Sequence, residues 1–142
     1  MKFMKKRILA VDDDASVRES LKKVLEETGY EVVLATDGSE GEIKLKEQMF
    51  DLLILDLNMP GRDGWDVLGC ASSYHPLLPV IIITGMFDQL DSTNIPGAAA
   101  LLKKPVDVLP LLKVIADVLG ETLEQRLGRV GGAAPVEPRI RA

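Results

Sequence analysis

The sequence predicts an α/β fold, in which a doubly wound parallel sheet of five strands is covered by helices on both faces. Five short apolar runs recur along the 142 residues, and polar residues do not alternate within them. Such runs are typical of strands buried on both faces. Segments with helical periodicity lie between successive runs. This alternation of strand and helix favours an open sheet with right-handed crossovers.

The predicted strands cover residues 8–11, 32–35, 52–55, 80–83 and 99–102. After the first strand, Val17, Leu21 and Leu25 fall on one face of a helix, and Gly29 ends that helix. A second helix is predicted over Gly38–Glu47, with Ile43 as its clearest apolar contact, and a third over residues 64–72.

The later helices are less regular. Residues 87–96 have little helical period and end in Asn-Ile-Pro-Gly, which predicts a fourth helix that is short or mobile. The last helix is predicted over residues 107–119, with Asp107 as its cap and an extension to about Leu127. Its inward residues are predicted to be Leu111, Leu112, Ile115 and Leu119.

The length of the chain suits one domain. We expect residues 1–128 to form it and residues 129–142 to be a disordered tail or a truncated linker. No apolar run approaches the roughly 20 residues that span a bilayer, so no membrane association is expected. The single Cys70 fits a reducing, cytoplasmic compartment. The net charge of −5 argues against nucleic-acid binding by this domain alone.

Acids, a hydroxyl and a lysine follow the predicted strands. The first strand ends in Asp12, Asp13 and Asp14, and the third in Asp56. The fourth ends in Thr84 and the fifth in Lys103 and Lys104. Because ligands of doubly wound sheets bind beyond the carboxyl ends of the strands, these side chains are expected at one rim.

This set of groups suits phosphoryl transfer. Clustered carboxylates repel one another, and a hard cation such as Mg²⁺ relieves that repulsion through oxygen ligands. A carboxylate can act as a covalent nucleophile, which makes Asp56 the candidate acceptor and Asp12 and Asp13 the candidate metal ligands. Lys104 and Thr84 would then contact the charged phosphoryl oxygens.

Four motifs in the expected order resemble the bacterial two-component response-regulator receiver domain: ILAVDDD, LLILDLNMPGRDGWDVL, PVIIITG and LLKKPVD. The resemblance runs from about Lys6 to Leu119. It implies a flavodoxin-like sheet with strand order 2-1-3-4-5. It also implies a phosphorelay function, in which a histidine kinase or a phosphotransfer protein phosphorylates Asp56 and an unknown output protein responds.

The resemblance further implies that Asp13, Asp56 and the backbone carbonyl of Asn58 hold Mg²⁺, with Asp12 assisting through water. Thr84 and Lys104 would contact the phosphoryl oxygens. Such a domain is a switch rather than an enzyme, and we expect a monomer or a weak homodimer. The chain departs from the family pattern at Leu101, where an aromatic residue is common, and in the short spacing from Thr84 to Lys104.

Other interpretations stay open from the residues alone. The three consecutive acids also suit a loop and a helix cap, a role that fits Asp14 best. A dehalogenase-like phosphatase uses similar groups, but it requires an acid at the position of Asn58. A flavin- or nucleotide-binding module would require a glycine-rich or hydroxyl-rich phosphate loop after the first strand, where this chain has three acids.

Overall fold

The computed structural model describes residues 5–57, 59, 64–85, 95, 97–129 and 139–141. Its strands are β1 (Arg7–Val11), β2 (Glu31–Ala35), β3 (Leu52–Asp56), β4 (Val80–Thr84), β5 (Ala98–Lys103) and β6 (Arg139–Arg141). They form one sheet in the order β2-β1-β3-β4-β5-β6, with every neighbouring pair parallel. The predicted order of the first five strands, 2-1-3-4-5, is therefore confirmed.

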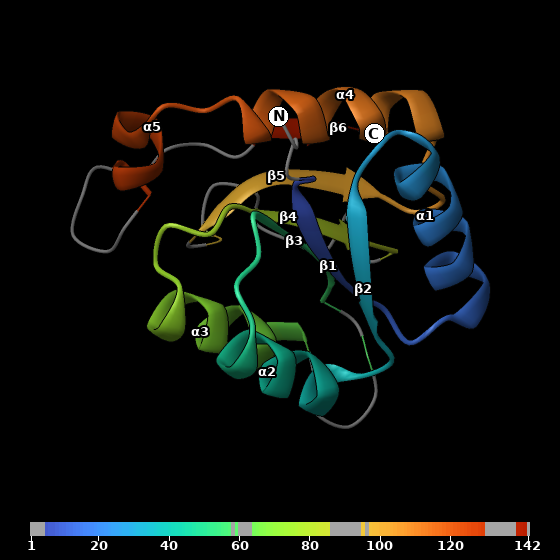
Figure 1. Cartoon of the computed structure of the whole chain (residues 1–142), viewed down its shortest axis with the longest axis horizontal. Coiled ribbons are helices and arrows are strands. Elements are labelled where there is room, and N and C mark those ends of the chain that lie inside the picture. Colours follow the sequence, from blue (N-terminus) through green and yellow to red (C-terminus); the bar gives the residue numbers. More distant parts are fainter. Residues whose placement is uncertain are drawn as a thin grey trace.

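The helices in the described part of the chain cover both faces of this sheet (Figure 1). They are α1 (Ala15–Glu27), α2 (Gly38–Glu47), α3 (Gly64–Tyr74), α4 (Val108–Leu119) and α5 (Leu123–Leu127). The core cluster that includes α1 and α4 residues is distinct from the cluster that includes α2 and α3 residues. The sheet thus carries a separate apolar core on each face.

The strands β1, β3, β4 and β5 are almost fully buried, as their uninterrupted apolar runs predicted, whereas edge strand β2 is only partly buried. Every residue of β3 and β4 is buried, including Asp56 and Thr84 at their carboxyl ends. Gly29 has a φ of +106°, a left-handed conformation that glycine adopts at little cost, and it follows the end of α1.

One expectation about core contacts is wrong, and a second is confirmed only in part. Ile43 on α2 is 53% exposed, and the buried positions of that helix are Gly38, Gly41 and Leu45. The glycines bring α2 close to the sheet, since a Cβ on Gly41 would meet Val11 at 3.0 Å. On α4 the buried residues are Leu111, Val114, Ile115 and Val118, whereas Leu112 and Leu119 are only partly buried.

The C-terminal part of the chain differs from the prediction. The last helix does not run on to Leu127, because α4 ends at Leu119 and a new helix, α5, is capped by Thr122. The Thr122 side chain accepts from the N–H of Gln125, and the Gln125 side chain accepts from the N–H of Thr122.

A short strand lies where a disordered tail was expected. Arg139–Arg141 form β6, which pairs with residues 100–102 of β5. Three residues with two arginines carry no recognisable strand pattern, so the pairing depends on an edge that only the folded sheet provides. The predicted fourth helix falls on residues 87–96, of which the structure describes only Ile95. Among the described residues, no helix is both long and apolar enough to cross a membrane.

Candidate functional site

The predicted rim residues meet where the parallel strands end. Asp12 and Asp13 follow β1, Asp56 ends β3, and Thr84 ends β4. Lys104 follows β5, and its backbone N–H donates to the carbonyl of Thr84 at 3.0 Å. Adjacent strands in the order β1-β3-β4-β5 therefore place all of these residues along one edge of the sheet.

A lysine ammonium joins two buried carboxylates at this rim. Lys104 Nζ lies 2.9 Å from Asp12 Oδ2 and 3.0 Å from Asp56 Oδ2. The side chains of Asp12 and Asp56 are only 3% and 4% exposed, whereas that of Lys104 is 23% exposed. Burial lowers the pKa of Lys104, but hydrogen bonds and charge attraction from Asp12 and Asp56 outweigh it, so the pKa lies above its ordinary value.

The carboxylates also form a group that suits a cation. One carboxylate oxygen from each of Asp12, Asp13 and Asp56 lies within 4.8 Å of the others. Asp12 and Asp56 are buried and Asp13 is exposed, so the group opens to solvent on one side. Hard oxygen donors with access to water fit Mg²⁺, which keeps several waters when it binds proteins. Asn58, the other predicted ligand, lies outside the described residues.

Asp14 is part of the helix that follows rather than of the acidic group. Its carboxylate accepts the N–H groups of Ser16 and Val17, and the Ser16 hydroxyl, at the start of α1. The hydrogen bond from the Ser16 side chain, with those from the backbone, lowers the pKa of Asp14. The predicted capping role of Asp14 is confirmed.

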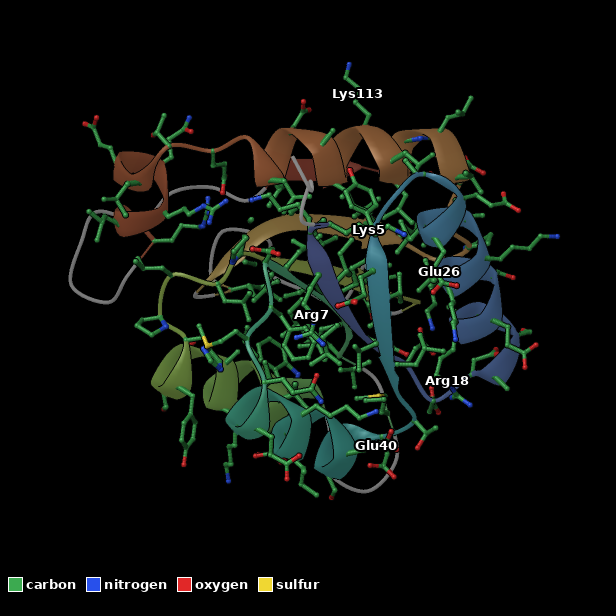
Figure 2. The ribbon with its side chains drawn as sticks, in the orientation of Figure 1. Lys5, Arg7, Arg18, Glu26, Glu40 and Lys113 are labelled. Atoms are coloured by element: carbon green, nitrogen blue, oxygen red, sulfur yellow. The ribbon has the colours of Figure 1, made fainter. Side chains whose placement is uncertain are left out.

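Two residues at the site were not predicted. The guanidinium of Arg18, on α1, donates to the backbone carbonyl of Asp12 at 2.8 Å. Figure 2 shows Arg18 and Glu40 on α1 and α2 at the same end of the molecule. Gly64 begins α3 directly against the end of β3, because a Cβ there would lie 2.3 Å from the Asp56 carbonyl oxygen.

No periodicity in the sequence indicates either contact. The only signal for Gly64 is its position: it is the second glycine after Met59 and Pro60, where the sequence predicts a loop beyond Asp56. Trp65, the next residue, is 45% exposed. The Lys104–Pro105 peptide bond is cis.

The open side of the site borders an apolar groove. A cavity of about 460 Å³ lies between α1 and the start of α4, and Lys104 and Asp14 are among the residues that line it. Val17, Leu21 and Val24 of α1 line one part of it, and Val106, Val108 and Leu111 line another. Val108 is 46% exposed and the adjacent Leu109 is 79% exposed.

Comparisons with known proteins agree with this arrangement. Residues 8–116 match the family described as the response regulator receiver domain. The chain is 38% identical to the response regulator protein FleR of Pseudomonas aeruginosa over 116 residues, which is 80% of this chain and 24% of FleR. It is 34% identical to the response regulator receiver protein CpdR of Brucella abortus, covering 80% of this chain and 97% of CpdR.

Solved structures give the same result. A CheY-like receiver domain protein from Methanospirillum hungatei superposes with a TM-score of 0.76 at 34% identity, covering 87% of this chain and 98% of that one. The response regulator TrrA of Thermotoga maritima, in complex with Mg²⁺ and BeF, gives a TM-score of 0.74 at 32% identity, covering 80% and 98%. The chain spans about a quarter of FleR and nearly all of CpdR. The chain therefore belongs to the response regulator receiver domain family of two-component signal transduction.

Proposed function

We propose that Asp56 is the phosphoacceptor of this receiver domain. The observation that supports this most directly is the Lys104 ammonium, which joins Asp56 to Asp12 beside a third carboxylate, Asp13. One Asp56 oxygen would attack the phosphorus of a phosphohistidine or a small acyl phosphate. The bond from phosphorus to the donor breaks, and its electron pair leaves with the donor. An acyl phosphate departs as its carboxylate, and a phosphohistidine departs as imidazole, whose freed nitrogen takes up a proton from water.

The surrounding residues would stabilise the charge of the transferred group. Lys104 and Thr84 would contact the phosphoryl oxygens, and Asp12, Asp13 and Asp56, with the Asn58 carbonyl, would hold Mg²⁺. When bound, Mg²⁺ supplies positive charge that offsets the repulsion between the carboxylates and an incoming phosphoryl group. The family neighbour TrrA was solved with Mg²⁺ and BeF, and the oxygen donors of this chain fit the same ion.

The donor would be a histidine kinase or a phosphotransfer protein that approaches the open rim. The apolar groove beside Lys104, with the exposed Val108 in its lining, supports a protein donor. Phosphorylation would then shift the population of conformations that an output protein recognises. On this proposal the domain is a cytoplasmic switch and not an enzyme.

The test is the intact mass of the protein after incubation with acetyl phosphate and Mg²⁺. The parent chain should gain one phosphoryl group, and the gain should need Mg²⁺. Asp56→Asn should gain nothing, whereas Asp117→Asn, a change at an exposed acid on α4, should behave as the parent does. A gain in Asp56→Asn would place the acceptor elsewhere. No gain in the parent, with a kinase as donor as well as with acetyl phosphate, would contradict the proposal.

A further inference from the structure

The far edge of the sheet is closed by the chain's own C-terminal strand. β6 pairs in parallel with β5, where Ala100, Leu101 and Leu102 lie opposite Arg139, Ile140 and Arg141. β5 is thereby an interior strand, with β4 on one side and β6 on the other. Nine residues, 130–138, connect β6 to the last residue described after α5.

Without β6, β5 would present an edge with the properties of an aggregation-prone strand. Ala98, Ala99, Ala100, Leu101 and Leu102 are all apolar and buried, and the first charge of the strand is Lys103 at its end. Edge strands in soluble proteins usually carry charges, prolines or bulges that prevent pairing with another chain. Residues 98–102 contain no charge and no proline. The register to β4 shifts at Ala99, between Ala98 and Ala100, so the regular part of this edge is residues 100–102, which β6 covers.

The opposite edge is protected by a side chain. On edge strand β2 the carbonyl of Leu34 accepts from Lys44 Nζ at 2.5 Å. An exposed acid, Glu31, begins that strand, and it pairs with Arg7 of β1. The two edges of the sheet are thus closed by different means. Lys44 of α2 bonds to the β2 edge, and an added strand, β6, pairs with the β5 edge.

The chain is also anchored where it leaves α5. Arg129 forms a two-pronged ion pair with Glu121, in which Nη1 donates to Oε2 at 2.7 Å and Nη2 pairs with Oε1. The two side chains are 8% and 2% exposed, so this pair is nearly buried. Planar bidentate pairs of this kind fix geometry, and this one fixes the start of the connection that returns to β5.

We propose that β6 protects the sheet edge: it pairs with the outer edge of β5 and so prevents that edge from pairing with a second copy of this chain. When β6 is released, the β5 strands of two copies would pair edge to edge around a twofold axis. This inference does not depend on phosphorylation of Asp56.

A second copy fits the exposed edge because of the charge pattern of β5. A twofold axis makes two copies of the same strand antiparallel. Pairing centred on Leu101 sets Lys103 of one copy opposite Ala99 of the other, so the two lysines do not face each other. Alanine and leucine fill the remaining positions, where no like charges oppose.

The experiment uses the full chain with Arg139→Pro and Ile140→Pro together. Successive N–H groups of a strand point to opposite edges, so one of these two prolines removes an N–H that faces β5. The matched control is Arg139→Val with Ile140→Val, which makes the same change in charge and keeps both N–H groups. Sedimentation velocity over a concentration series measures self-association, and hydrogen exchange locates it.

The proline variant should dimerise at least about tenfold more tightly than the valine control. Its residues 98–103 should become more protected from exchange as the concentration rises. Equal association in the two variants would overturn the proposal, and so would association without added protection in β5. If the double proline variant does not fold, Ile140→Gly, which weakens the strand and keeps its N–H, is held to the same two criteria.

Discussion

Lys104 is the residue on which the charge balance of the site depends. Its ammonium pairs with both Asp12 and Asp56, whose side chains are only 3% and 4% exposed. Removing one partner of a buried ion pair leaves the other charge poorly solvated, and that loss exceeds the net value of the pair. The neighbouring Lys103 is exposed, so the two lysines offer a matched comparison one residue apart.

Lys104→Met should lower the free energy of unfolding by about 1–3 kcal/mol in the absence of divalent ions, a range that allows for the partial exposure of the lysine. Lys103→Met should stay within about 0.5 kcal/mol of the parent. Urea denaturation with a chelator measures both. Saturating Mg²⁺ should reduce the loss in Lys104→Met, because the cation takes over part of the neutralising role. Equal losses for the two lysines would contradict this account of the site.

Gly64 is the second residue with a role that depends on close contact. An added Cβ would lie 2.3 Å from the Asp56 carbonyl oxygen and 2.4 Å from Leu57 Cα. These are backbone atoms, so they cannot move aside without shifting the strand end that carries Asp56. Gly69 lies on the same helix, is exposed, and would have no atom within 4 Å of an added Cβ.

Gly64→Ala should therefore destabilise the protein by about 1–3 kcal/mol, whereas Gly69→Ala should stabilise it by about 0.5–1 kcal/mol through helix propensity. Thermal unfolding of the two variants checks the signs. Gly64→Ala should also slow the uptake of phosphoryl groups from acetyl phosphate, because it displaces the backbone of Asp56. A stable Gly64→Ala variant with parental phosphorylation would show that the strand end tolerates the shift.

At the scale of elements, the sequence predicts what depends on local pattern and misses what depends on distant pairing. The strands and the rim could be predicted, because buried apolar runs end at Asp12, Asp56, Thr84 and Lys104 and parallel strands align their carboxyl ends. β6 could not, because its strand conformation depends on the β5 edge. The break between α4 and α5 was missed although Gly120 precedes it, since helical apolar spacing continues beyond that glycine.

Helix α2 and strand β2 are joined by a polar cluster that gives a pH-dependent contribution to stability. The Glu40 carboxylate accepts from Lys44 Nζ at 2.9 Å and from the Thr36 hydroxyl at 2.8 Å. Hydrogen bonds from Lys44 and then Thr36 lower the pKa of Glu40 below its ordinary value of 4.5. A lowered folded-state pKa stabilises the protein above the unfolded value, and that contribution is lost as the pH falls through the folded value.

Glu40→Gln should accordingly be less stable than the parent at pH 7, and the gap should narrow as the pH falls below about 4.5. The gap should be small, because the carboxylate is partly exposed and solvent screens the pair. Urea midpoints of the two proteins measure this difference in stability. The pH series runs from about 3 to about 7, which spans the ordinary glutamate pKa. Glu19→Gln, at an exposed position of α1, is the control and should show no such trend. A stability difference between Glu40→Gln and the parent that grows as the pH falls would contradict this account of the Glu40 cluster.

At the scale of the whole molecule, one sheet separates two apolar cores that have no side chain in common among the residues the structure describes. Ile82 of β4 belongs to the core beneath α2 and α3, and Ile115 of α4 belongs to the core on the opposite face. Both are fully buried. The helices of the two faces lie on opposite sides of the sheet (Figure 1). The faces are therefore independent in side-chain packing but are joined through the backbone of the strands between them.

This arrangement predicts additive losses within a single cooperative transition. Ile82→Val and Ile115→Val should each lower the free energy of unfolding by about 0.5–1.5 kcal/mol, and the double variant should lose their sum to within about 0.5 kcal/mol. Additivity follows because neither cavity touches the other, and cooperativity follows because neither core persists without the shared strands. Urea unfolding followed by far-UV circular dichroism and by fluorescence of Trp65, the single tryptophan, measures both properties. Different transition midpoints for the two probes would contradict a single cooperative transition. A coupling energy above about 1 kcal/mol would contradict independent packing of the two faces.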